Sequence, residues 1–237
     1  MSQPTLSVIV PAWNEEKYIG RAIGSLRRAA QVYERERGCT AEIIAVDNNS
    51  QDHTGDVARE HGAQVVLEPR RGYGRACLAG IAALNPGVEV VTFMDADGSD
   101  DPADLPRLVA ALDQADMAIG SRVHGAEAGS LAPMQRAGNR LATFLLRILY
   151  GARCTDLGPF RAIRRDALER LSMRDLNFGW TIEMQIKARR ANLRVVELPV
   201  AYRRRRGGRS KVSGSLRGSI LAGAKILWTI LRYRFSD

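Results

Sequence analysis

Short apolar runs alternate with longer amphipathic segments through the first half of the chain, and this alternation constrains the fold more than any other feature. The runs have the length of buried strands, and the segments between them carry apolar residues at helical spacing. The expected strands are Leu6–Val10, Glu42–Val46, Gln64–Leu67, Val88–Met94 and Met117–Ile119, and the expected helices are Glu15–Arg35, Asp52–His61, Gly74–Leu84 and Ala103–Leu112. This order predicts an α/β fold with a Rossmann-like, mainly parallel sheet and helices on both faces.

The second half of the chain is less regular. Its expected elements are a helix over Met134–Tyr150, a strand over Phe160–Ile163, a helix over Trp180–Arg190 and a strand over Val195–Val200. We divide the chain into one domain of residues 1–215 and a C-terminal amphipathic helical segment of residues 216–237.

The C-terminal segment has two possible roles. A transmembrane helix needs about 20 mostly apolar residues, and Lys225 interrupts the apolar residues of this segment. A helix in the membrane interface, with Trp228 and Tyr233 near the lipid headgroups, is one interpretation. The other is a helix that packs on its own domain or on a partner subunit.

Polar residues follow four of the expected strands. They are Asn14 and Glu15, the run Asp47–Ser50, the acidic run that begins at Asp95, and Ser121 with Arg122. Ligands of open α/β sheets bind beyond the carboxyl ends of the strands. The sequence therefore predicts a site at this edge of the sheet.

The acidic run places four carboxylates directly after an apolar strand. Asp95 and Asp97 are two residues apart, so in extended backbone their side chains point to the same side. Such a pair can hold a hard divalent cation, Mg²⁺ or Mn²⁺, together with water and phosphate oxygens. We expect the other acids, Asp100, Asp101 and Asp104, to cap the helix that follows.

The net charge of +9 is concentrated in the second half of the chain. Residues 161–237 hold 19 Lys and Arg against 6 Asp and Glu, whereas residues 1–160 hold 16 against 20. This distribution favours an anionic partner, either a phosphate compound or a membrane surface. No zinc-finger spacing or aromatic-rich strand accompanies the basic residues, so nucleic acid is not expected as a partner.

Two further features bear on the compartment. The three cysteines, Cys39, Cys77 and Cys154, lack metal-ligand spacing and are expected to be free thiols in a reducing compartment. The N-terminus has no basic region, apolar core or cleavage site of a secretory signal. We therefore expect a cytoplasmic protein, peripheral at the cytoplasmic face of the membrane.

Several motifs resemble those of family 2 glycosyltransferases of the GT-A fold, and most closely those of the dolichyl- and polyprenyl-phosphate sugar synthases. The motifs occur in the order found in that family and extend over nearly the whole chain. They are PAWNEE (Pro11–Glu16), VDNNSQDHTG (Val46–Gly55), RRGYGRA (Arg70–Ala76), MDADGSDDP (Met94–Pro102), GSR (Gly120–Arg122), TDLGPFRAIRRDAL (Thr155–Leu168), GWTIEMQIKA (Gly179–Ala188) and GGRSKVSG (Gly207–Gly214).

The resemblance implies specific roles for residues of this chain. The residues expected to bind the nucleotide are Pro11, Ala12, Glu15, Asp47, Gly74, Arg75, Asp95 and Ala96. Asp95 and Asp97 would hold the divalent cation and the diphosphate, and Asp97 is counted among the catalytic residues. The residues implied for the acceptor phosphate are Arg122, Arg136, Arg205 and Lys211, with Arg122 also catalytic. Asp47 and the glycines could instead simply shape turns.

The implied reaction is inverting transfer of a sugar from a UDP- or GDP-linked donor to a lipid-linked acceptor, with polyprenyl phosphate preferred. A phosphate acceptor is already largely dianionic at pH 7 and needs no strong base. A hydroxyl acceptor needs a carboxylate base, and Glu183 is then the candidate unless it merely pairs with Lys187 at i+4. Ser99 stands where these synthases often have glutamine, which leaves the third metal contact open.

Two other classes of protein compete with this interpretation. A sugar-phosphate nucleotidyltransferase also uses an α/β sheet and a metal, but a glycine- and lysine-rich signature is expected after its first strand, where this chain has PAWNEE. A non-catalytic membrane scaffold would leave the pairing of Asp95 with Asp97 unexplained.

Overall fold

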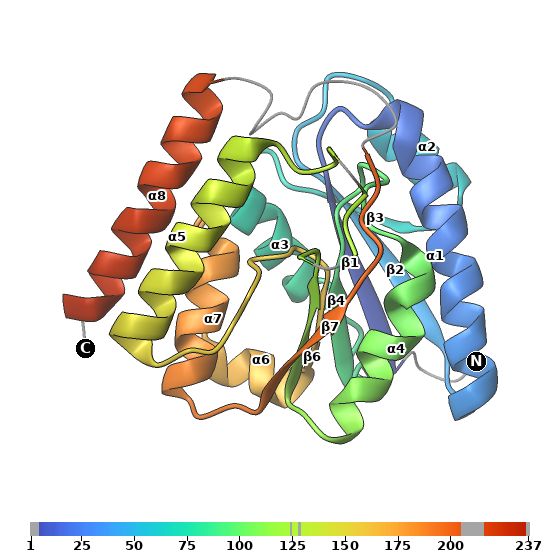
Figure 1. The fold of residues 1–237 in the computed structure, drawn as a ribbon. Coiled ribbons are helices and arrows are strands. Elements are labelled where there is room, and N and C mark those ends of the chain that lie inside the picture. The colour runs from blue at the N-terminus through green and yellow to red at the C-terminus, as the bar shows by residue number, and fades with distance from the viewer. Residues whose placement is uncertain (1–4, 124, 128, 205–215, 236–237) are drawn as a thin grey trace.

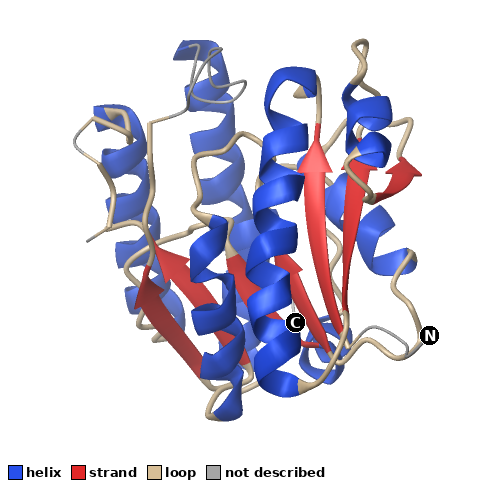
Figure 2. Ribbon diagram, turned by 90° about the vertical axis from the view of Figure 1, so that its right-hand side faces the viewer, coloured by secondary structure: helices blue, strands red, loops and turns tan. Residues whose placement is uncertain are grey.

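The chain forms one mixed seven-stranded sheet with helices on both faces (Figures 1 and 2). The structure is a computed structural model that describes residues 5–123, 125–127, 129–204 and 216–235. The strands are β1 (Leu6–Ala12), β2 (Ala41–Asp47), β3 (Gln64–Leu67), β4 (Val90–Phe93), β5 (Met117–Ser121), β6 (Arg161–Arg164) and β7 (Val195–Pro199). The helices are α1 (Glu16–Arg37), α2 (Thr54–Glu60), α3 (Tyr73–Ala82), α4 (Leu105–Ala110), α5 (Pro133–Tyr150), α6 (Arg165–Leu171), α7 (Trp180–Arg190) and α8 (Leu216–Phe235).

The sheet is mainly parallel, as the alternation of strands and helices predicts. Its strand order is β3-β2-β1-β4-β6-β5-β7. β1 pairs in parallel with β2 and β4, β2 with β3, and β5 with β7, while β6 runs antiparallel between β4 and β5. The carboxyl ends of β1, β2 and β4 therefore meet at one edge.

The continuous apolar sequence of β1 follows from its position in the middle of the sheet. Successive side chains of a strand point to opposite faces. Val8 and Val10 accordingly join the core beneath α1 and α4, whereas Ile9 joins the core beneath α3, α6 and α7. Both faces are covered, so neither needs polar residues.

Two elements differ from the expectation. The helix expected over Ala103–Leu112 is divided into a 3₁₀ turn (Pro102–Asp104), the α-helix α4 and a second 3₁₀ turn (Ala111–Asp113). Pro106 has no amide hydrogen, so it is tolerated only in the first turn of an α-helix, and α4 begins one residue before it. The short helix α6 was not predicted at all.

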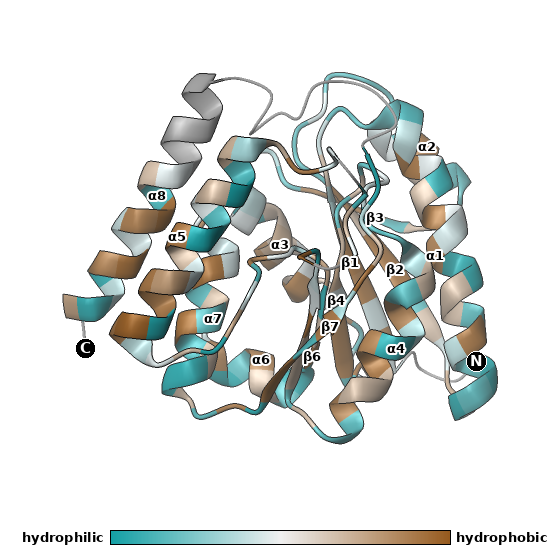
Figure 3. Cartoon of the chain, viewed as in Figure 1, coloured by the Kyte–Doolittle hydropathy of each residue, from teal (hydrophilic) through white to brown (hydrophobic). Residues whose placement is uncertain are grey.

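Helix α8 spans the expected segment and packs on α5 and α7. Ile226 and Ile230 of α8 pack in a third apolar cluster with Leu146 of α5 and Ile186 of α7. Trp228, Leu231 and Phe235 remain exposed, and apolar residues are visible along α8 and the neighbouring α5 in Figure 3. None of the helices in the described ranges is both long and apolar enough to span a bilayer.

Candidate active site

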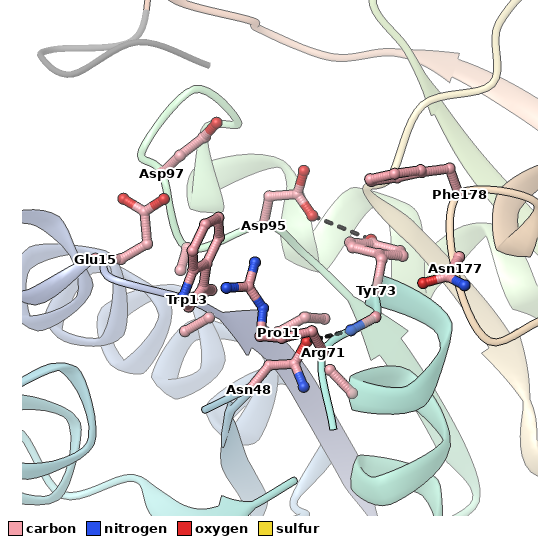
Figure 4. Close-up of a pocket in the computed structure, with 14 residues that line it drawn as sticks. Pro11, Trp13, Glu15, Asn48, Arg71, Tyr73, Asp95, Asp97, Asn177 and Phe178 are labelled. Carbon is pink, nitrogen blue, oxygen red and sulfur yellow. Dashed lines mark hydrogen bonds between the residues drawn. The ribbon is translucent and has the colours of Figure 1, made fainter. Parts of the chain in front are cut away.

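A cavity of about 310 Å³ lies at the carboxyl ends of β1, β2 and β4 (Figure 4). Five segments of the chain build it: the end of β1, the loop after β2, the start of α3, the acidic run after β4 and the loop before α7. The lining residues are Pro11, Ala12, Trp13, Glu15, Asn48, Arg71, Gly72, Tyr73, Ala76, Asp95, Ala96, Asp97, Asn177 and Phe178. Six residues expected at the nucleotide or metal are thus brought together: Pro11, Ala12, Glu15, Asp95, Ala96 and Asp97.

The two carboxylates of the acidic run are oriented by neighbouring groups. The hydroxyl of Tyr73 donates to Asp95 over 3.0 Å, and the backbone N–H of Ser99 donates to Asp97 over 2.9 Å. Burial, followed by the charge of Asp95, raises the pKa of Tyr73 well above its ordinary value, so Tyr73 stays a hydrogen-bond donor. Figure 4 shows Asp97 beside Glu15, and Asp95 between Trp13 and Tyr73.

An aromatic and cationic pair forms another wall. The guanidinium carbon of Arg71 lies 3.0 Å from the centre of the Trp13 ring, in a cation–π contact. Asn48 holds the chain on either side of Arg71, since its side-chain amide donates to the carbonyls of Glu68 and Arg70 and accepts from the N–H of Gly72. A planar ligand such as a nucleobase fits beside a flat surface of this kind.

The acidic pair suits a divalent cation that is shared with a ligand. Within the ranges that the structure describes, no three His, Cys, Asp or Glu side chains are grouped so as to hold a metal ion. Mg²⁺ sites commonly use only one or two carboxylates and take their remaining ligands from water and phosphates. Asp95 and Asp97, which both line the cavity, fit this type of site.

A second cavity, of about 510 Å³, lies between the loop after β5, α5 and α8. Arg122, Arg136 and Arg140 line it together with Asp156. Arg122 forms a two-pronged ion pair with Asp156, with nitrogen–oxygen distances of 2.8 and 2.7 Å, and its backbone N–H also donates to Asp156 over 2.7 Å. The Asp156 side chain is 2% exposed.

This ion pair fixes the charge of both partners. Burial alone would lower the pKa of Arg122, but the hydrogen bonds and charge of Asp156 raise it. Burial likewise opposes ionisation of Asp156, but Arg122 lowers the Asp156 pKa below its ordinary value. Arg122 is therefore a permanent, oriented cation at the second cavity.

Three residues expected at the nucleotide, Asp47, Gly74 and Arg75, are not part of the lining of the first cavity. Asp47 shapes its own turn by accepting a hydrogen bond from the N–H of Ser50 over 2.9 Å, and it does not line the cavity. Gly74 and Arg75 also lie outside the lining. A Cβ atom at Gly74 would overlap the carbonyl oxygen of Asp175, so this glycine permits close packing of two backbones. The contacts of Asp47 are those of a residue that shapes a turn, and the contacts of Gly74 are those of a glycine required for close packing.

Glu183, the candidate base for a hydroxyl acceptor, is not brought to either cavity. It is fully buried, and its carboxylate accepts hydrogen bonds from the N–H groups of Arg174 and Asp175 and from the hydroxyl of Tyr233. The expected i+4 pair with Lys187 is present at 2.8 Å. Both oxygens of this carboxylate are thus engaged by donors within the protein.

The capping expectation holds for Asp101 only, because Asp104 stands at the N-cap of α4 without a side-chain capping hydrogen bond. Asp101 is the N-cap of the first 3₁₀ turn and accepts from the N–H of Ala103, whereas Asp104 accepts from the N–H of Ala201 and pairs with Arg107. Asp100 caps nothing: it is 3% exposed, and neither carboxylate oxygen has a hydrogen-bond partner among the described residues. Burial, then the charges of Asp95 and Asp97, raises the pKa of Asp100 well above its ordinary value.

Two of the four residues expected at the acceptor phosphate are in the part of the chain that the structure describes. Arg122 and Arg136 line the second cavity together, while Arg205 and Lys211 lie outside the described residues. Ser99, whose role toward the metal was left open, is buried and forms a hydrogen bond with Tyr202. Burial is the main cause that raises the pKa of Tyr202 to about 12.

Several residues that line the two cavities were not predicted from the sequence. Trp13, Asn48, Arg71 and Tyr73 stand inside quoted motifs, and their proximity to the implied binding residues was an available signal. Asn177 and Phe178 carry no signal, because the loop that holds them joins the site only through packing. Arg140 and Asp156 complete the second cavity.

An α/β sheet with an acidic cavity at the carboxyl ends of its strands agrees with the glycosyltransferase class that the motifs resemble. The sequence profile described as Glycosyl transferase family 2 matches residues 7–172. The chain therefore belongs to glycosyltransferase family 2.

Relatives of the chain cover nearly all of it. An uncharacterized glycosyltransferase of Mycobacterium tuberculosis is 42% identical, over 94% of this chain and 96% of the relative. An undecaprenyl-phosphate mannosyltransferase of Micrococcus luteus is 30% identical over 95% and 97% of the two chains. A polyprenol monophosphomannose synthase of Mycolicibacterium smegmatis is 33% identical over 90% and 83%.

Solved structures confirm the GT-A fold. Glucosyl-3-phosphoglycerate synthase from Mycobacterium tuberculosis, crystallised with Mn²⁺, uridine diphosphate and phosphoglyceric acid, superposes with a TM-score of 0.75 at 22% identity. The match covers 99% of this chain and 80% of the other. The mainly parallel sheet with helices on both faces, expected from the sequence, is thus a glycosyltransferase fold.

Proposed function

We propose that this protein is an inverting, divalent cation-dependent glycosyltransferase that moves a sugar from a UDP- or GDP-linked donor to a polyprenyl phosphate. The observation that carries the proposal is the pairing of two cavities of opposite character. One has the carboxylates of Asp95 and Asp97 at its rim, and the other has Arg122 and Arg136 in its lining. Asp100 forms a β-bridge with Tyr202, and the guanidinium carbon of Arg122 lies 5.1 Å from the centre of the Tyr202 ring, so the acidic run and the second cavity approach each other at Tyr202.

The first cavity is suited to the donor. Trp13 and Arg71 offer a flat surface for a base, and Asp95 and Asp97 lie where a diphosphate can share a cation with them. When bound, that cation would neutralise the charge that develops on the leaving diphosphate. Tyr73 keeps Asp95 in place through its hydroxyl.

The second cavity is suited to a phosphate acceptor. A phosphate monoester has a second pKa of about 6, so at pH 7 it is already a nucleophile without help from a base. Arg122, held rigidly by Asp156, can orient that phosphate against the anomeric carbon, and Arg136 and Arg140 add positive charge. The names of the polyprenyl- and undecaprenyl-phosphate relatives support the same acceptor class.

We further propose that the protein works as a peripheral protein at the cytoplasmic face of a membrane, where a lipid-linked acceptor is presented. Among the described side chains of α8, the exposed apolar residues are Trp228, Leu231 and Phe235, and Arg232 and Arg234 lie among them. Apolar residues next to arginines suit the interface of an anionic bilayer.

A donor screen tests the proposed reaction. UDP- and GDP-linked sugars are incubated with polyprenyl phosphate and Mg²⁺ or Mn²⁺, and the product is identified by its mass. We expect Asp97→Asn to lose transfer by roughly 100-fold or more while retaining the wild-type circular dichroism spectrum. Asp113→Asn, a change at an exposed surface carboxylate, is the matched control. Transfer by Asp97→Asn at the wild-type rate would contradict the metal role.

A further inference from the structure

The loop between α6 and α7 lies against the donor cavity, and we call its residues Arg174–Gly179 the 174–179 segment. Asn177 and Phe178 of this segment line the cavity on the side opposite Glu15 and Trp13 (Figure 4). The N–H of Arg75 in α3 donates to the carbonyl of Leu176 over 3.1 Å. The segment therefore packs directly on the helix that borders the cavity.

Glu183 of α7 fixes the backbone of this segment. Its carboxylate accepts from the N–H of Arg174 over 3.0 Å and from the N–H of Asp175 over 2.7 Å. Asp175 in turn accepts from the N–H groups of Asn177 and Gly179, over 2.8 and 3.0 Å. A buried carboxylate is tolerated only with such partners, so these bonds define one conformation of the segment.

Helix α8 completes the arrangement from a distant part of the chain. The hydroxyl of Tyr233 donates to Glu183 over 2.5 Å, and the ammonium of Lys225 lies 3.0 Å from the carboxylate of Asp175. A Cβ atom at Gly179 would collide with the hydroxyl of Thr229. Lys225, Thr229 and Tyr233 recur at every fourth position, so they share one face of α8, and this face contacts the 174–179 segment.

We propose that Lys225 and Tyr233 are positioning residues for the donor cavity. Acting through Asp175 and Glu183, they hold the 174–179 segment so that Asn177 and Phe178 face the bound nucleotide. This inference rests on the proposed function, because it assigns the first cavity to the donor. It also gives Glu183 a role that requires no contact with substrate.

The test measures nucleotide affinity in the full-length protein. UDP and GDP, each with Mg²⁺, are titrated calorimetrically into wild type, Tyr233→Phe and Lys225→Met. Each variant removes a hydrogen bond or ion pair to a buried carboxylate, and we expect roughly tenfold weaker binding of the nucleotide that wild type prefers. Lys225→Arg keeps the charge and should stay within about twofold of wild type.

A matched control separates positioning from general loosening of α8. Tyr150→Phe also removes a hydroxyl that holds α8, because Tyr150 donates to the carbonyl of Ile230. That hydrogen bond does not involve the 174–179 segment. The Tyr150→Phe variant should therefore lower the midpoint of thermal unfolding without changing nucleotide affinity.

The outcomes are distinguishable. Wild-type affinity in both Tyr233→Phe and Lys225→Met overturns the inference and leaves the proposed function intact. An equal loss of affinity in Tyr150→Phe also overturns it, since the effect would then follow from loosening of the helix. If wild type binds neither nucleotide, the proposed function fails and the inference fails with it.

Discussion

Replacement of Asp156 by asparagine is the sharpest test of the charge arrangement at the second cavity. The Asp156 carboxylate accepts three hydrogen bonds from Arg122, and the side chains of Asp156 and Arg122 are 2% and 15% exposed. Removing one partner of a buried ion pair typically costs about 3–5 kcal/mol, because the remaining charge stays buried without compensation. Asparagine keeps one acceptor oxygen, so we expect a loss near the lower end, about 3 kcal/mol, from a total of about 5–15 kcal/mol.

Urea denaturation followed by circular dichroism measures this loss. Asp113→Asn is the matched control. The Asp113 carboxylate also accepts two hydrogen bonds from the guanidinium of one arginine, Arg37, but this pair lies at the protein surface. The unfolding midpoint of Asp113→Asn should match that of wild type within error. The double variant Arg122→Met/Asp156→Asn should recover part of the lost stability, since no uncompensated charge is left.

The stability difference between wild type and Asp156→Asn should depend on pH, because it depends on the ionisation of Asp156. Arg122 lowers this pKa in the folded state. The stabilisation is therefore fully present above the unfolded value of about 3.9 and is lost as the pH falls below it. The difference in the free energy of unfolding between wild type and Asp156→Asn should be constant near neutral pH and should decrease below about pH 4. An Asp156→Asn variant as stable at pH 7 as Asp113→Asn would refute the reasoning.

Two further predictions concern packing and the membrane. Gly74→Ala should destabilise the protein by about 1–3 kcal/mol in urea denaturation, because its methyl group meets the carbonyl of Asp175. Gly24→Ala, where the new methyl group meets only the tip of an arginine side chain, should be neutral or stabilising. Leu231→Ser should weaken sedimentation with vesicles of anionic lipid, whereas Val32→Ser, similarly exposed on α1, should not. Equal binding of these last two variants would argue against α8 as the membrane contact.

Local sequence predicted much of the fold because periodicity is a local property. The five early strands and most helices follow from apolar spacing, and the burial of β1 on both faces explains its continuous apolar run. The predicted boundaries of α4 were wrong because Pro106 restricts where an α-helix can begin. The position of Asp95 and Asp97 was predictable too, since residues just beyond adjacent parallel strands reach the same edge.

The roles of other polar residues were not predictable in this way. Asp47 and Glu183 both stand in motifs that suggest chemistry. In the structure, Asp47 accepts a hydrogen bond from the N–H of Ser50, and Glu183 accepts one from the N–H of Asp175. A carboxylate is the same group in either role. Its role depends on which N–H donors and which cavity its neighbours bring to it, and those neighbours need not be close in sequence.

The sequence by itself determined the alternating architecture, the acidic pair at the end of β4 and the excess of basic residues in the second half. Only the tertiary structure decided that Asn177 and Phe178 line the first cavity, that Asp156 fixes Arg122, and that α8 contacts the loop beside this cavity. The physical reason is the distance along the sequence over which each kind of interaction acts. Backbone periodicity and strand-end chemistry act over a few residues, whereas hydrogen bonds such as that from Tyr233 to Glu183 join residues 50 positions apart, and only the packed fold brings them together.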